Sequence, residues 1–173
     1  MSDVSDRCDT CGFVYDPGKP IDVGPQIVST AALISDLLTA ESPTVARRPD
    51  LDTWSILEYG CHVRDVLLVQ RERVLLALRV DEPTVVAMGR DERVAADGYS
   101  DQRPADVARQ IGDAALMFTG VLARLDEQSW QRTMIYGYPQ RESRSLAWVA
   151  THTLHEVVHH LGDVRRQLQA SAP

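Results

Sequence analysis

The stretch THTLHEVVHHLGDV, residues 151–164, guides the interpretation of the whole chain, because it contains four of the five histidines. Apolar residues recur every three or four positions through it and beside it: Ala150, Leu154, Val157, Leu161, Val164 and Leu168. That spacing predicts an amphipathic helix. Side chains four residues apart lie above one another on a helix, so the stretch offers two pairs of metal ligands: His155 with His159, and Glu156 with His160.

A helical wheel separates these two pairs. At roughly 100° per residue, Glu156 and His160 lie at the edge of the apolar stripe, whereas His155 and His159 face outward. His152 lies one turn before Glu156 on the same face. The segment HEVVH, residues 155–159, also matches the HExxH motif of zinc metalloproteases, with Glu156 as general base. We do not favour a metalloprotease, because no third ligand follows at a familiar spacing.

Four helices account for most of the chain. Apolar periodicity predicts them over roughly 25–40, 53–79, 104–126 and 143–169. Pro104 suits the first turn of the third helix, and Asp52 or Thr53 is the expected cap of the second. Four amphipathic helices predict an all-α fold, a four-helix bundle of the kind that builds metal sites from side chains on facing helices.

The connections between the predicted helices differ in character. Residues 80–103 contain scattered Gly, Pro and acidic residues and are expected to form a long crossover loop. Residues 127–142 are expected to form an aromatic-rich loop, in which Trp130, Tyr136 and Tyr138 are candidates to line the mouth of a site. No strand is predicted.

Residues 1–20 form a polar segment distinct from the bundle predicted over 21–173. The sequence CDTCG, residues 8–12, resembles one metal-binding knuckle of a rubredoxin or a zinc ribbon, in which both thiolates turn inward and backbone N–H groups point at sulfur. Cys8 and Cys11 alone do not complete a tetrahedral site, so two further ligands must come from elsewhere. A redox-active dithiol and a solvated tail are the alternatives.

Charge and composition exclude several classes of partner. The net charge of −7 argues against binding of a nucleic-acid backbone, which requires a basic face. No apolar run approaches the ~20 residues of a membrane span, and the first residues lack the apolar core of a signal peptide. We therefore expect a cytoplasmic protein. Lys19 is the only lysine among the 18 lysine and arginine residues. This preference for arginine over lysine indicates a GC-rich bacterial genome.

The fifth histidine, His62, lies on the flank of the apolar stripe of the second predicted helix. With a pair from the last helix it makes three ligands, the number that catalytic zinc sites use. Two motifs resemble the DinB/YfiT-like superfamily of metalloenzymes: Trp54-Ser55 with Glu58 and HVRD (residues 62–65), and HHLGDV (residues 159–164). The resemblance covers roughly residues 25–169.

This resemblance implies a metal site formed by a histidine of helix two and two ligands four apart on helix four. Most members have two histidines there, whereas the mycothiol-dependent maleylpyruvate isomerase branch has Glu followed by His. Carried onto this chain, the ligands are His62, Glu156 and His160, and the register of His155 and His159 stays open as the alternative. The implied metal is Zn²⁺ or another divalent ion such as Ni²⁺.

The implied activity is chemistry of low-molecular-weight thiols, by a thiol S-transferase or a thiol-dependent isomerase. The ion would lower the pKa of a bound thiol. His152 would then act as a base or orient a ligand. The expected partner is a small-molecule thiol or its substrate, and a homodimer is a candidate assembly. The alternative is a non-catalytic zinc-binding or sensing bundle with a structural metal site.

A second metal site follows from the outward pair on the last helix. Cys8 and Cys11 together with His155 and His159 have the ligand types and spacing of a Cys₂His₂ zinc site. We expect this site to fasten the N-terminal segment to the outer face of the helix, with folding free energy on the order of 10 kcal/mol from the ion. Cys61 is a rival ligand, because it neighbours His62 and is expected on an outward face.

Overall fold

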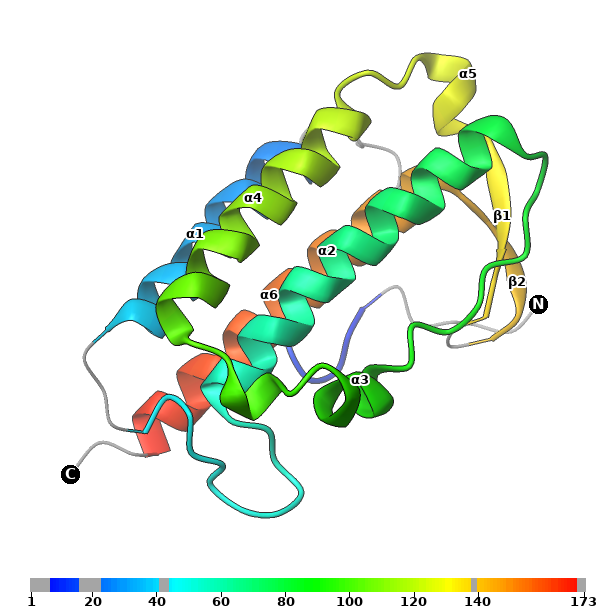
Figure 1. Cartoon of the computed structure of the whole chain (residues 1–173). Helices are drawn as coiled ribbons and strands as arrows, with labels where there is room; N and C mark the ends of the chain where they lie inside the picture. Colours follow the sequence, from blue (N-terminus) through cyan, green and yellow to red (C-terminus); the bar gives the residue numbers. More distant parts are fainter. Residues whose placement is uncertain (1–6, 16–22, 41–43, 138–139, 171–173) are drawn as a thin grey trace.

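Four long helices run side by side in the structure: α1 (Val23–Thr39), α2 (Ile56–Arg79), α4 (Pro104–Leu122) and α6 (Leu146–Ala170) (Figure 1). The structure is a computed structural model that describes residues 7–15, 23–40, 44–137 and 140–170. Each long helix lies where apolar periodicity predicts one, and the all-α four-helix bundle is confirmed. Within the described residues, no helix combines the length and the apolar character that crossing a membrane requires.

The order of the helices around the bundle differs from their order along the chain. Helix α1 packs against α4 and α6, and α2 packs against the same two helices, so the consecutive helices α1 and α2 lie on a diagonal. Figure 1 shows α2 and α4 side by side and running in the same direction. The chain must therefore return along the bundle after α2, which is why the connection over residues 80–103 is long.

This crossover is more ordered than the loop predicted from the sequence. It contains a short helix α3 (Arg90–Ala96) and a 3₁₀ turn η2 (Tyr99–Asp101). Buried Asp65 of α2 anchors it: one carboxylate oxygen accepts hydrogen bonds from the Tyr99 hydroxyl at 2.7 Å and from Arg93 at 3.1 Å. Helix α3 buries none of its residues, so it has no apolar period that a sequence reading could detect.

A β-hairpin precedes α6, and the prediction that the chain has no strand is wrong. Strand β1 (Thr133–Tyr136) pairs antiparallel with β2 (Glu142–Ser145), and a one-turn helix α5 (Glu127–Trp130) lies just before it. The backbone of Ile135 also exchanges hydrogen bonds with Pro83 and Val85 of the crossover. Because residues 143–145 pair with β1, helix α6 begins at Leu146 rather than at 143. Both strands are four residues long, too short for alternation to be recognised.

Helix α2 begins at Ile56, nearly two turns before His62, and its first turn fixes the start of the helix that carries this histidine. Its cap is Ser55, not Asp52 or Thr53 as predicted. The Ser55 hydroxyl accepts the N–H of Glu58 at 3.2 Å, and the carboxylate of Glu58 accepts the N–H of Ser55 at 2.7 Å, which is a capping box. Two nitrogens of Arg48 also donate to the buried Glu58, at 2.8 and 2.7 Å.

We predict that Glu58→Gln destabilises the fold by about 1–2 kcal/mol, because it weakens the cap and leaves Arg48 without its carboxylate. Burial alone would raise the pKa of Glu58, but hydrogen bonds from Arg48 and Ser55 outweigh burial and hold the pKa below its ordinary 4.5. Its contribution to stability is therefore present above pH 4.5 and is lost as pH falls through the lowered pKa.

Thermal unfolding from pH 7 down to pH 3 measures this effect, at about 2–4 °C of melting temperature per kcal/mol. The difference between Glu58→Gln and the unaltered chain should be largest near neutral pH and should shrink in acid. Glu72→Gln is the matched control, since Glu72 lies on the same helix with its side chain 68% exposed. A difference that does not change with pH would contradict the assignment.

Candidate metal centre

The packing of α2 against α6 brings His62 together with Glu156 and His160. One ligand atom from each of the three side chains lies within 4.8 Å of the others. The rings of His62 and His160 meet edge to face with their centroids 4.8 Å apart. This is the ligand set that the resemblance implies, and it follows from the apolar stripe of α6, whose Val157 and Leu161 are buried.

His62 carries a direct sign of a missing ligand. The residue is 3% exposed, and its Nδ1 has no hydrogen-bond partner among the described residues. A buried polar atom without a partner costs free energy, and native structures satisfy nearly all such atoms with protein, water or an ion. The three side chains therefore fit a metal ion, with imidazole and carboxylate donors of the type that divalent transition metals accept.

Burial and neighbouring charges set the protonation of this cluster. Burial, together with nearby His160, lowers the pKa of His62 to about 4, so the imidazole is neutral at neutral pH. Burial alone would raise the pKa of Glu156, but His160 and His152 outweigh it and hold the pKa at about 2. Neutral imidazole and ionised carboxylate are the forms that bind metals.

Asp163 orients the ring of His160. Its carboxylate lies 2.8 Å from Nδ1 of His160, which directs Nε2 of the ring toward Glu156, where the distance to Oε2 is 3.8 Å. A carboxylate on the second ring nitrogen is the usual support of a metal-binding histidine. Burial lowers the pKa of His160, but Asp163 and Glu156 outweigh it and raise the pKa above its ordinary value. Asp163 and Tyr59, whose ring contacts His160, line an open hollow on the surface.

His152 lies directly beside the cluster, as the one-turn spacing predicts. Its Nε2 is 3.8 Å from Oε1 of Glu156, and its ring stacks on Trp148 with centroids 4.7 Å apart. Burial is the main cause that lowers the pKa of His152 to about 4. The ring of Tyr136, at the end of strand β1, packs edge to face against His152. Tyr138 lies outside the described residues.

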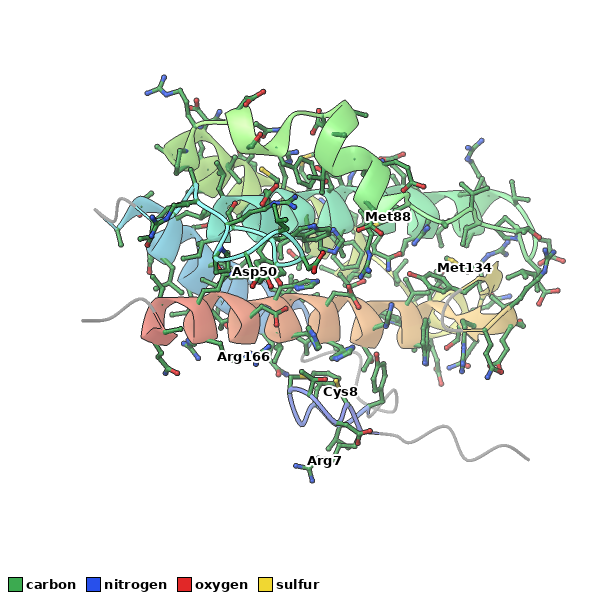
Figure 2. All side chains as sticks on the ribbon, turned by 90° about the horizontal axis from the view of Figure 1, so that it is seen from below. Arg7, Cys8, Asp50, Met88, Met134 and Arg166 are labelled. Atoms are coloured by element: carbon green, nitrogen blue, oxygen red, sulfur yellow. The ribbon has the colours of Figure 1, made fainter. Side chains whose placement is uncertain are left out.

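A second cluster lies on the neighbouring face of α6. Cys8, Cys11, His155 and His159 each offer a ligand atom, and the four atoms lie within 4.8 Å of one another. Figure 2 shows the segment with Cys8 along one side of α6, whereas Asp50 and Met88 lie on the other side. The structure thus brings together all four residues of the predicted second site.

Two findings at these clusters differ from the sequence analysis. Cys61 is not on an outward face: it is fully buried in the core, burial raises the pKa of its thiol to about 12, and it joins neither cluster.

Tyr15, in contrast, was not among the predicted site residues. Its hydroxyl lies 2.9 Å from Nδ1 of His152 and 2.7 Å from Nδ1 of His155. The only signal for Tyr15 was its position shortly after the CxxC motif.

Comparison with known proteins identifies the class of this fold and site. Residues 27–164 match the DinB superfamily. The match spans most of the chain, so the chain belongs to this superfamily, as the two sequence motifs indicated.

One solved structure has a similar fold along most of its length. The chain is similar to YfiT from Bacillus subtilis, described as "a probable metal-dependent hydrolase with an unusual four-helix bundle topology". The two structures agree with a TM-score of 0.76 over 90% of each chain, at 12% sequence identity. This similarity establishes a shared fold. No curated protein sequence matches the chain.

We predict that His62→Ala abolishes metal binding at the first cluster, because it removes one of three donors. Asp163→Asn should keep all three donors but weaken binding about 10–100-fold, because the ring of His160 loses the carboxylate that orients it. Elemental analysis and competition against a chelating dye measure both effects. Asp113→Asn is the matched control, since Asp113 is an exposed carboxylate of α4. Unchanged metal binding in both variants would refute a metal centre here.

Proposed function

We propose that the chain is a divalent-metal enzyme that acts on a low-molecular-weight thiol or a conjugate of one. His62, Glu156 and His160 would hold the ion, Zn²⁺ or a similar ion such as Ni²⁺. The observation that carries the proposal is the three-donor cluster with a buried, unpartnered nitrogen on His62. Membership of the DinB superfamily and the description of YfiT as a probable metal-dependent hydrolase support it.

The number of donors favours an enzyme over a purely structural metal site. Structural zinc sites are closed by four protein ligands, whereas catalytic sites keep three and leave one position for water or substrate. The bound ion would supply Lewis acidity and lower the pKa of a thiol or water in that position. Tyr59 and Asp163 line an open hollow at His160, and we assign this hollow as the approach for a small molecule.

Two roles compete for His152 in this proposal. As a general base, it would accept the proton of the thiol at Nε2. As an orienting group, it would instead carry a proton on Nε2 and present it to Glu156, whose Oε1 lies 3.8 Å away. The second role agrees with the position of His152 between Glu156 and Tyr15. His152→Gln separates the two roles, because glutamine retains an N–H donor but cannot take up a proton.

The alternative function, a zinc-binding or sensing bundle without catalysis, has one observation in its favour. The second cluster has four candidate protein donors and so matches a closed structural site. The two functions differ at the first cluster: an enzyme must admit a small molecule there, whereas a structural bundle must not.

We predict that small thiols bind at the first cluster. In cobalt-loaded protein, added mycothiol, glutathione or cysteine should increase the sulfur-to-cobalt charge-transfer absorbance, and His62→Ala should abolish the increase. The same thiols with an electrophilic acceptor should give an S-conjugate, detected by mass spectrometry, at a rate that depends on the metal. His152→Gln should keep most of this rate if His152 orients Glu156, and should lose about 10²–10⁴-fold if it is the base.

Three results would count against this function. An absorbance unchanged by every thiol would exclude a thiol as metal ligand. Metal-dependent ester or amide hydrolysis without any effect of thiols would assign the centre to hydrolysis instead. Metal binding with neither reaction would favour the structural bundle.

A further inference from the structure

Cys8, Cys11, His155 and His159 come from opposite ends of the chain, yet their ligand atoms meet on one face of α6. We propose that these four side chains hold one structural Zn²⁺, and that this ion determines, through Tyr15, which nitrogen of His152 carries the proton beside the first cluster. The zinc site itself does not depend on the proposed function. Only the consequence for Glu156 rests on it.

The distance between Cys8 and His159 supports a shared ion. In a tetrahedral site with Zn–S of about 2.3 Å and Zn–N of about 2.0–2.1 Å, sulfur and nitrogen are about 3.5–3.6 Å apart. Sγ of Cys8 lies 3.6 Å from Nδ1 of His159. A closed set of two thiolates and two imidazoles at C-x₂-C and H-x₃-H spacing is a common donor set of structural zinc.

The backbone around the two cysteines folds into a tight turn. The N–H of Cys8 donates to the carbonyl of Phe13 at 2.8 Å, and the N–H of Gly12 donates to the carbonyl of Cys8 at 2.8 Å. Gly12 has a φ of 72°, a left-handed conformation that favours glycine. Burial raises the pKa of the Cys8 thiol, but N–H groups of Cys11 and Thr10 outweigh it and hold the pKa below its ordinary value.

His155, like His62, has a buried ring nitrogen without a hydrogen-bond partner among the described residues. That nitrogen is Nε2, whereas Nδ1 of the same ring lies 2.7 Å from the Tyr15 hydroxyl. The ring of Phe13 packs on His155 with centroids 5.2 Å apart, which holds the imidazole in place. A metal-bound histidine usually donates its other ring N–H to an oxygen, and Tyr15 provides that oxygen.

The Tyr15 hydroxyl joins the two clusters, because it lies between His155 and His152. A hydroxyl has one proton, so it donates to one of the two Nδ1 atoms and accepts from the other. With the ion on Nε2 of His155, the neutral ring carries its proton on Nδ1 and donates it to Tyr15. Tyr15 then donates to Nδ1 of His152, and the proton of neutral His152 must lie on Nε2. That nitrogen lies 3.8 Å from Oε1 of Glu156, so His152 presents an N–H rather than a lone pair toward the carboxylate.

Without an ion, nothing fixes this arrangement of protons. The contact between Cys8 and His159 is then a thiol–imidazole hydrogen bond, and Cys8 and Cys11 are a free dithiol. The hydrogen bonds through Tyr15 have no fixed direction, because neither nitrogen of His155 is committed to a metal. The zinc site thus decides whether the proton of His152 is fixed on Nε2, facing Glu156.

Metal analysis of the full-length chain tests the site. The Cys8→Ser/Cys11→Ser double variant should lose one zinc per chain, and the first cluster should keep its ion. Cys61→Ala is the matched control, because it removes a thiol that belongs to neither cluster and should lose none. No loss in the double variant, or loss of all metal from both clusters together, would overturn the proposal.

A spectroscopic measurement keeps the proposal testable even if the double variant does not fold. Cobalt-loaded His62→Ala, which retains both cysteines, should show tetrahedral cobalt with sulfur-to-cobalt charge transfer, one ion per chain. This result is expected whether or not the first cluster is a metal centre, so failure of the proposed function leaves it unchanged. Cobalt without sulfur ligation would overturn the second site.

Nitrogen NMR of the imidazole rings tests the link through Tyr15, since the ¹⁵N shifts distinguish the two tautomers. In the zinc-loaded chain, His152 should carry its proton on Nε2. Tyr15→Phe should keep its zinc and the ring that packs between Phe13 and Trp148, but the ¹⁵N shifts of His152 should change. The double cysteine variant should change them as well. Identical His152 shifts in all three proteins would refute the link.

Discussion

The 100° rotation per residue of an α-helix is the constraint on which both clusters depend. Glu156 and His160 form one ligand pair on α6, and His155 and His159, each one residue earlier, form the other. The shift of one residue places the first pair toward α2 and the second toward the N-terminal segment. Four residues on two adjacent turns thus belong to two clusters. Any change in the packing angle of α6 would move both sites at once.

The chemistry of the two clusters differs because their partners differ. Helix α2 contributes His62 to the first cluster, which therefore has three candidate donors. The N-terminal segment contributes Cys8 and Cys11 to the second cluster, which therefore has four. The first lies where Trp54 packs on the ring of His62 and Tyr59 on that of His160, and Tyr59 also lines a surface hollow. At the second, Phe13 and Tyr15 pack against the ring of His155, and all four residues of the cluster are half-buried. In the proposed function, three donors would leave a position for a reactant at the first cluster, and four would close the second.

The sequence alone predicted the long helices and the seven residues that the structure gathers into the two clusters, because amphipathic periodicity and ligand spacing are properties of contiguous residues. It failed where geometry depends on residues far apart in the chain. The hairpin of β1 and β2 is held by tertiary packing, since Tyr136 is anchored by Gln70 and Arg73 of α2. Helix α3 depends on Asp65 rather than on a buried face of its own. Cys61 appeared to face outward only because the docking of the crossover on α2 could not be foreseen.

Tyr15 could not be predicted for a related reason. Its hydroxyl contacts His152 and His155, which come 137 and 140 residues later in the chain. The long separation in sequence also means that the residues of the second cluster are synthesised at different times. Cys8 leaves the ribosome 151 residues before His159, which at 5–20 residues per second is roughly 8–30 s. During that interval the nascent chain exposes two thiols near its start with no imidazole partners. A zinc site built from these four residues can therefore close only after the last helix has been made, and the two thiols must stay reduced until then.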